Sequence, residues 1–159
     1  MAKVLESNTS GAGLRVGIAV ARFNELVTER LLDGALTTLR ERGVPDDGVI
    51  VSWVPGAFEL PLAARALLQS GCDAAVVLGA IVRGGTDHYD YVCSGVTDGV
   101  MRVQLDLGRP VGFGVLTCAE MEQAVSRAGG ADGNKGSDAA MAALEMHHQL
   151  RGVADGGAA

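Results

Sequence analysis

Residues 73–82 read DAAVVLGAIV and form the most continuously apolar stretch of the chain. An apolar run of this length, rich in Val and Ile, is typical of a strand buried on both faces of a parallel sheet. The polar, glycine-rich segment RGGTD follows at 83–87, and valines then recur every three or four residues within 88–107. That spacing predicts a long amphipathic helix, so this region is predicted to fold as strand, loop and helix.

The same alternation extends to both ends of the chain. Apolar runs at 14–20, 49–54 and 111–117 predict three further strands. Strands that alternate with helices pair in parallel through right-handed crossovers, with helices covering both sheet faces. The prediction is therefore a three-layer, flavodoxin-like α/β domain with a mainly four-stranded parallel sheet. Four other helices are predicted. One runs from a side-chain cap at Asn24 to Gly43, and a second follows the turn Pro55-Gly56. A third covers 119–128, and a fourth covers 134–150 after a loop at 129–133.

Length and composition fit one domain. The chain has 159 residues, of which 48% are hydrophobic, so it can bury a substantial core. No internal repeat or long linker divides the sequence. We expect an N-terminal arm over 1–13, the α/β domain over 14–151 and a flexible tail of small residues over 152–159.

Charge and residue patterns disfavour several classes of function. A formal net charge of −6 without a cluster of Lys or Arg disfavours nucleic acid and anionic membranes as partners. No apolar run approaches the ~18 residues of a membrane helix. Cys72, Cys93 and Cys118 lack the Cys-x-x-Cys spacing, which predicts reduced thiols in a cytoplasmic protein. No spacing of His, Cys or acidic residues suggests a metal site.

Ligands of parallel α/β sheets bind beyond the carboxyl ends of the strands. The segment 84–86 lies there, between a strand and a helix start, where free backbone N–H groups favour an anion; a simple tight turn is the alternative. It matches neither the Walker motif nor a dinucleotide fingerprint. His88 opens the helix, where the helix dipole disfavours the charged imidazole, so it is either a neutral base or a polar cap.

Two aromatic residues follow other strand ends in a chain with only 4% aromatic residues. Phe23 and Phe58 are placed to stack on a flat ring, although either could belong to the core. Glu59 falls in the first turn of a predicted helix, which suits a carboxylate whether or not it binds a ligand.

Three further residues present a geometric problem. Phe113 lies near the amino end of its strand, and a helix over 119–128 would carry Arg127, and then Lys135, toward that same edge. A strand spans roughly 20 Å, so one subunit would not bring them to His88. Either these residues lie outside the site or a neighbouring subunit supplies them.

Several short motifs occur in a fixed order along the chain. They are ARFN at 21–24, WVPGAFELP at 53–61, LGAIVRG at 78–84, TDHYDYV at 86–92, GVLT at 114–117, EQA at 122–124 with RAG at 127–129, and GNKG at 133–136. Together they resemble the signature blocks of the 6,7-dimethyl-8-ribityllumazine synthase family over about 14–146. Each motif alone is weak, but the ordered combination is highly specific.

The resemblance implies an enzyme of riboflavin biosynthesis. Family members condense 5-amino-6-(D-ribitylamino)uracil with 3,4-dihydroxy-2-butanone 4-phosphate and release phosphate and water, without a metal or cofactor. The steps are imine formation, phosphate loss, proton shifts and ring closure. This chemistry needs an acid–base group, an anion site and a pocket for a flat ring.

The resemblance also implies roles for individual residues. His88 would carry protons, Phe23 would stack on the pyrimidine, and Gly85 and Thr86 would donate N–H groups to the phosphate. Phe113, Arg127 and Lys135 would come from the neighbouring subunit, with Arg127 binding phosphate and Lys135 reaching the pyrimidine, and Asp138 orienting these cations. The remaining pocket residues would be Ala57, Phe58, Glu59, Ala80, Ile81 and Val82; Ala80 would act through its backbone because it lacks a hydroxyl group.

Assembly is likewise an expectation from the resemblance. Family members form homopentamers, some of which build sixty-subunit icosahedral shells, and the segment 129–136 has no insertion, as in shell-forming members. The arm before Gly11 is expected to add a strand to a neighbour's sheet. Whether a shell encloses riboflavin synthase stays open. The rival interpretations are a non-catalytic flavin or lumazine carrier and a general flavodoxin-like phosphate-binding module.

Overall fold

Strand β3 (Ala74–Val82) lies between β1 (Val16–Ala21) and β4 (Val111–Cys118) in a parallel sheet, and β2 (Val49–Val54) pairs with the other side of β1. The computed structural model describes residues 1–157. Every residue of β3 before Val82 is buried, as its apolar run predicts. The predicted four-stranded parallel sheet is confirmed.

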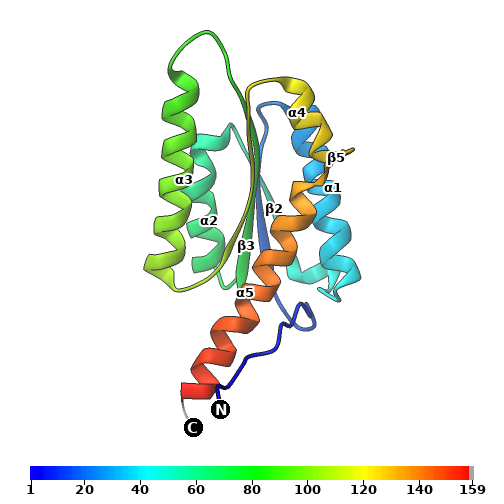
Figure 1. Cartoon of the computed structure of the whole chain (residues 1–159), viewed down its shortest axis with the longest axis vertical. Coiled ribbons are helices and arrows are strands. Elements are labelled where there is room, and N and C mark those ends of the chain that lie inside the picture. Colours follow the sequence, from blue (N-terminus) through cyan, green and yellow to red (C-terminus); the bar gives the residue numbers. More distant parts are fainter. Residues whose placement is uncertain (158–159) are drawn as a thin grey trace.

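Helices cover both faces of this sheet (Figure 1). On one face lie α1 (Glu25–Glu41) and α5 (Lys135–Gly157), and on the other lie α2 (Leu60–Gln69) and α3 (His88–Leu107). The structure is therefore the predicted three-layer α/β domain. The remaining elements are short: η1 (Asp46–Gly48), η2 (Ala57–Glu59), α4 (Met121–Ser126), and an antiparallel hairpin of β5 (Ala128–Gly130) and β6 (Gly133–Asn134).

Side chains of β3 alternate between two cores. Val76 and Leu78 face the core under α1 and α5, while Ala75 and Val77 face the core under α2 and α3. Burial of a Val or Leu side chain contributes about 1.5–3 kcal/mol. Packing on both faces therefore holds the carboxyl ends of the strands, where the predicted site residues lie.

Two glycines allow α5 to approach its neighbours closely. A Cβ atom at Gly112 of β4 would overlap the carbonyl of Ala139 in α5, and one at Gly136 of α5 would overlap the carbonyl of Leu31 in α1. Because both positions lack a side chain, the first turns of α5 pack directly on β4 and α1. This packing places Lys135, the first residue of α5, beside the sheet.

The segment between β4 and α5 differs from its prediction of a helix over 119–128 and a loop over 129–133. Helix α4 has only six residues, and a hairpin replaces the loop. A capping box formed by Glu120 and Gln123 starts the helix late. Gly129 adopts a φ of 95°, a conformation that favours glycine, and the chain enters the hairpin there.

The end of α5 also differs from its prediction. The helix was predicted to end near residue 150 and to be followed by a flexible tail over 152–159, but α5 continues to Gly157. Residues 158–159 lie outside the described part of the chain. Leu5 of the N-terminal arm approaches Gly152, so the extension of the helix has a packing partner.

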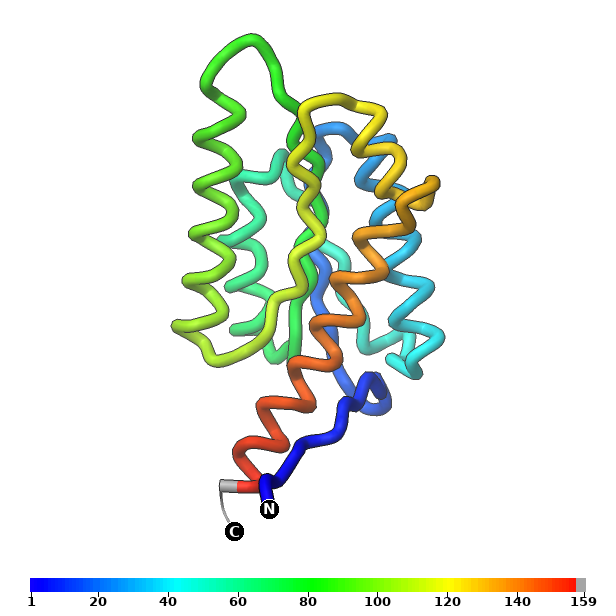
Figure 2. The backbone as a smooth tube through the Cα atoms, in the orientation of Figure 1, coloured from blue at the N-terminus to red at the C-terminus, as the bar shows by residue number. Residues whose placement is uncertain are grey.

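The N-terminal arm lies along its own α5 (Figure 2). Three hydrogen bonds join them: Ser7 Oγ to Glu145 Oε1 at 2.8 Å, Gln149 Nε2 to the Glu6 carbonyl at 3.2 Å, and His148 Nε2 with the Ser10 carbonyl at 2.7 Å. The arm forms no strand in this chain. Its predicted pairing with a neighbouring sheet stays a prediction.

The predicted side-chain cap by Asn24 is wrong. Asn24 adopts a left-handed conformation with a φ of 62° and makes no side-chain cap bond to α1. Its Nδ2 instead donates to the carbonyl of Ala80 at 2.8 Å. Asparagine tolerates this conformation better than most residues. The residue therefore ties the β1–α1 loop to the carboxyl end of β3.

Candidate functional site

The loop after β3 presents exposed backbone at the carboxyl edge of the sheet. Gly84 and Gly85 are exposed, and a Cβ atom at either position would meet nothing within 4 Å. Thr86 Oγ1 accepts a hydrogen bond from the His88 amide at 3.4 Å, at the first residue of α3. The loop thus combines open amide groups with a helix N-terminus, which is an arrangement that can bind an anion.

Arg83 joins the two ends of this loop. Its guanidinium lies 4.3 Å from the centre of the Tyr89 ring, and its Nη2 is 3.5 Å from Asp90 Oδ1. Its amide donates to the Cys118 carbonyl of β4 at 2.9 Å. Burial raises the pKa of the Tyr89 phenol, and the adjacent Cys93 raises it further. These contacts fix the turn of α3 that carries His88, whose side chain is exposed.

Phe23 and Phe58 are not core residues. Their side chains are 72% and 63% exposed, and both follow strand ends at the same edge of the sheet. The Phe23 amide donates to the carbonyl of Pro55 at 3.1 Å, which joins the β1–α1 and β2–η2 loops. One edge of the Phe58 ring contacts Gly95 of α3. The two rings are therefore available to stack on a planar ligand.

The other predicted pocket residues differ in how they can act. Ala57, Ala80 and Ile81 are buried, and the Ala80 carbonyl already accepts the Asn24 side chain, whereas Glu59 is exposed and Val82 is half-buried. Buried side chains cannot meet a ligand at the surface directly. Contacts from Ala57, Ala80 and Ile81 would therefore have to use backbone groups, as expected for Ala80.

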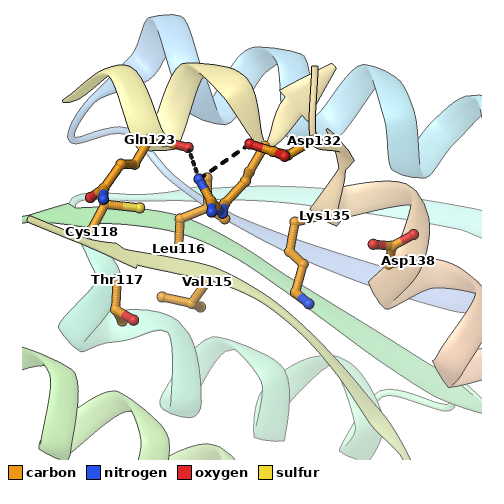
Figure 3. A pocket seen from close by; sticks show the side chains of 9 residues that line it. Val115, Leu116, Thr117, Cys118, Gln123, Asp132, Lys135 and Asp138 are labelled. Atoms are coloured by element: carbon orange, nitrogen blue, oxygen red, sulfur yellow. Dashed lines mark hydrogen bonds and ion pairs between the residues drawn. The ribbon is translucent and has the colours of Figure 1, made fainter. Parts of the chain in front are cut away.

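A second set of polar residues surrounds an open cavity of about 350 Å³ beside β4 (Figure 3). The side chains of Arg127, Lys135 and Asp138 line it together with Asp132 and Gln123. Its floor is the carboxyl half of β4, and its complete lining is Val115, Leu116, Thr117, Cys118, Gln123, Arg127, Asp132, Lys135 and Asp138.

Arg127 is held at one end of its guanidinium. Its Nη1 donates to the Gln123 carbonyl at 3.0 Å and lies 3.6 Å from Asp132 Oδ2 (Figure 3). The same carboxylate oxygen accepts the Ser126 hydroxyl at 2.5 Å. Burial raises the pKa of the Cys118 thiol, and the positive charge of Arg127 partly offsets this shift.

The predicted position of Arg127 and Lys135 near the amino edge of the sheet is wrong. Helix α4 has six residues, or about 9 Å, so it cannot run back along the length of β4. Both residues line the cavity with the carboxyl half of β4 instead. Phe113 does lie in the amino half of β4, opposite Val77, and packs half-buried toward α2 and α3.

One chain does not gather all predicted site residues into one cavity. The cavity beside β4 contains Arg127 and Lys135 but neither His88 nor the exposed rings of Phe23 and Phe58. Strand β4 is the last in the order β2-β1-β3-β4, so it is an edge strand among the described residues. The predicted site residues on these loops and in this cavity therefore form two separate groups, one on the loops after β1, β2 and β3 and one beside β4.

Asp132 is a cavity residue that the sequence pattern did not predict. We expected Asp138 to orient the cations, and Asp138 does line the cavity, but it is Asp132 that pairs with Arg127. An acidic residue between two cations in a glycine-rich segment was visible in the sequence. Its pairing was not, because the segment was predicted to be a loop without defined contacts.

Residues 1–157 contain neither a cluster of potential metal ligands nor a helix that could span a membrane. No three or more His, Cys, Asp or Glu side chains in this part of the chain gather into a group that could hold a metal ion. None of its helices combines the length and the apolar composition needed to cross a membrane. Cys72, Cys93 and Cys118 are all free thiols.

Comparison with known protein families agrees with the motifs in both groups of residues. The family model described as 6,7-dimethyl-8-ribityllumazine synthase matches residues 13–151, which include every site residue discussed above. The match covers most of the 159-residue chain, and the family has the flavodoxin-like α/β fold that the structure shows. The chain belongs to the lumazine synthase family.

Proposed function

We propose that this chain is a catalytic lumazine synthase, a transferase of riboflavin biosynthesis. It would condense 5-amino-6-(D-ribitylamino)uracil with 3,4-dihydroxy-2-butanone 4-phosphate and release phosphate and water. Family membership supports the substrate class. The observation that carries the catalytic proposal is the set of groups at the carboxyl edge of the sheet: exposed His88, the open amides of the loop after β3, and the exposed rings of Phe23 and Phe58.

Each of these groups fits a step of the reaction. The rings would sandwich or flank the pyrimidine, and the amides of Gly85 and Thr86 would bind the phosphate that leaves. The 5-amino group would attack the ketone to form an imine with loss of one water, and elimination of phosphate would leave an enol that a proton shift converts into a new ketone. His88 would move the protons during these steps and during ring closure, when the ribitylamino nitrogen attacks this new ketone and a second water is lost.

We propose that a neighbouring subunit completes the site with Phe113, Arg127 and Lys135. Arg127 and Lys135 face a cavity beside an edge strand, apart from the loop that carries His88. A second chain placed against that edge would add two cations to a site that otherwise offers His88 and backbone amides. Arg127 would bind phosphate through two N–H groups, and Lys135 would reach the pyrimidine.

The decisive experiment mixes the purified protein with both substrates and follows the absorbance of the lumazine product. We expect formation faster than the protein-free background, and a much slower rate in His88→Ala. Absence of acceleration, combined with tight binding of riboflavin or lumazine, would support a non-catalytic carrier instead. A His88→Ala variant with unchanged activity would remove His88 from the mechanism while leaving the enzyme assignment intact.

We further propose a cytoplasmic homopentamer that assembles into a sixty-subunit shell. Exposed apolar side chains on α2 and α3 support a large contact between chains, among them Leu62, Tyr91 and Leu105. Riboflavin synthase is the candidate content of such a shell. Light scattering that shows no species above ten subunits would exclude the shell, and removal of residues 1–10 without any change in assembly would exclude a role for the arm between subunits.

A further inference from the structure

Asp132 lies next to Arg127 in a geometry that engages only one of the guanidinium nitrogens. Its Oδ2 is 3.6 Å from Nη1, the nitrogen that also donates to the Gln123 carbonyl. Within residues 1–157, no protein acceptor contacts Nε or Nη2 of Arg127. The Nε–Nη2 edge of the planar fork thus stays available for two parallel bonds to an oxyanion.

The carboxylate is itself fixed by its own hairpin. Asp132 Oδ2 accepts the Ser126 hydroxyl at 2.5 Å, and the Asp132 amide donates to the Ser126 carbonyl at 3.0 Å. These bonds hold Asp132 independently of Arg127. The contact with Asp132 can therefore hold the Arg127 side chain, which has several rotatable bonds, in one conformation.

We propose that Asp132 is a positioning residue that holds Arg127 by Nη1 and presents its other edge to phosphate. This inference rests on the proposed role of Arg127 in binding the phosphate of the substrate. An arginine that is already ordered loses less side-chain entropy when phosphate binds. The negative charge of Asp132 acts against phosphate, but it faces the opposite end of the guanidinium, and water screens it because both side chains are partly exposed.

The test uses Asp132→Asn in the assembled, full-length protein. Asparagine keeps an oxygen that can accept the Ser126 hydroxyl but removes the charge that pairs with Arg127. Inorganic phosphate binding is measured by calorimetry at fixed ionic strength, and KM for each substrate is measured separately. We expect the phosphate Kd and the KM for the phosphate substrate to rise about three- to tenfold, the scale of one ordered long side chain. The KM for the uracil substrate should not change.

Asp138→Asn is the matched control. It removes the same charge from the same cavity, but Asp138 makes no ion pair with Arg127 among the described residues. Its phosphate Kd should stay the same or fall slightly. A tighter or unchanged phosphate Kd in Asp132→Asn would overturn the proposal, because charge repulsion would then outweigh positioning.

A double-mutant cycle separates positioning from a general effect on the hairpin. In an Arg127→Ala background, Asp132→Asn should have no further effect on phosphate binding. An equal effect in both backgrounds would overturn the proposal. If phosphate binds with this coupling but the protein forms no lumazine, only the proposed function is contradicted. If the wild-type protein binds no phosphate, the role of Asp132 is overturned.

Discussion

The amide of Lys135 donates a hydrogen bond to the carbonyl of Arg127 at 2.8 Å, across the hairpin of β5 and β6. Two cationic residues that are eight positions apart in the sequence therefore lie side by side at the entry to α5. Both line the cavity beside the edge strand β4. This pairing makes Arg127 and Lys135 one structural unit, and it motivates separate tests of the two charges.

Arg127→Ala and Lys135→Ala should weaken the binding of different substrates. We expect Arg127→Ala to raise the KM for the phosphate substrate roughly ten- to hundredfold, the scale of a lost charge-assisted hydrogen bond. Lys135→Ala should mainly raise the KM for the uracil substrate. Steady-state kinetics with each substrate varied in turn measures both effects, and equal changes for both substrates in both variants would contradict this division.

The Arg83 contacts predict a link between the loop after β3 and activity. Arg83→Ala removes the contact with the Tyr89 ring and the ion pair with Asp90, each worth about 0.5–1 kcal/mol at an exposed site. We expect faster amide hydrogen exchange in residues 84–88 and a several-fold loss of kcat. Asp90→Asn serves as the control because it keeps the ring contact, and its exchange should lie between those of wild type and Arg83→Ala.

Close packing of α5 predicts a strong effect of Gly136→Ala. The added methyl group would overlap the carbonyl of Leu31, so helices α1 and α5 would have to separate. We expect a loss of about 1–3 kcal/mol in the free energy of unfolding, measured by denaturant titration. Gly84→Ala is the control, because its methyl group meets nothing and should change stability by less than about 0.5 kcal/mol.

His147 predicts a pH dependence of stability. Burial lowers the pKa of its imidazole below the ordinary 6.5, and the adjacent His148, with ring centres 5.1 Å apart, lowers it further. Because the folded chain then binds this proton less readily than the unfolded chain, stability should fall as the pH drops below about 6.5 and through the lowered pKa.

His147→Gln should flatten this decline. The measurement is the Tm between pH 7 and pH 5 at a fixed protein concentration, since assembly also affects stability. A wild-type Tm that is constant over this range, or a decline that persists unchanged in His147→Gln, would show that His147 does not determine it.

The main features of the fold were predictable because they depend on local burial patterns. The apolar run of β3 and the valine spacing after it predicted that strand to within one residue and α3 over its full length, His88–Leu107. Strands of one parallel sheet end at the same edge, so the sequence also placed Phe23, Phe58 and His88 there. Exposure of the two rings could not be predicted, because an aromatic residue after a strand suits both a core and a binding surface.

By itself, the sequence determined the layered α/β architecture, the family, and the edge of the sheet at which Phe23, Phe58 and His88 lie, because periodicity reports which side of each element is buried. Only the tertiary structure decided the contacts between elements. The hairpin that joins Arg127 to Lys135, the pairing of Asp132 with Arg127, and the bond from Asn24 to Ala80 each depend on backbone conformations and chain directions that residue spacing does not encode. The position of the N-terminal arm was not predictable for the same reason. Its polar sequence has no periodic pattern, and specific hydrogen bonds hold it along α5.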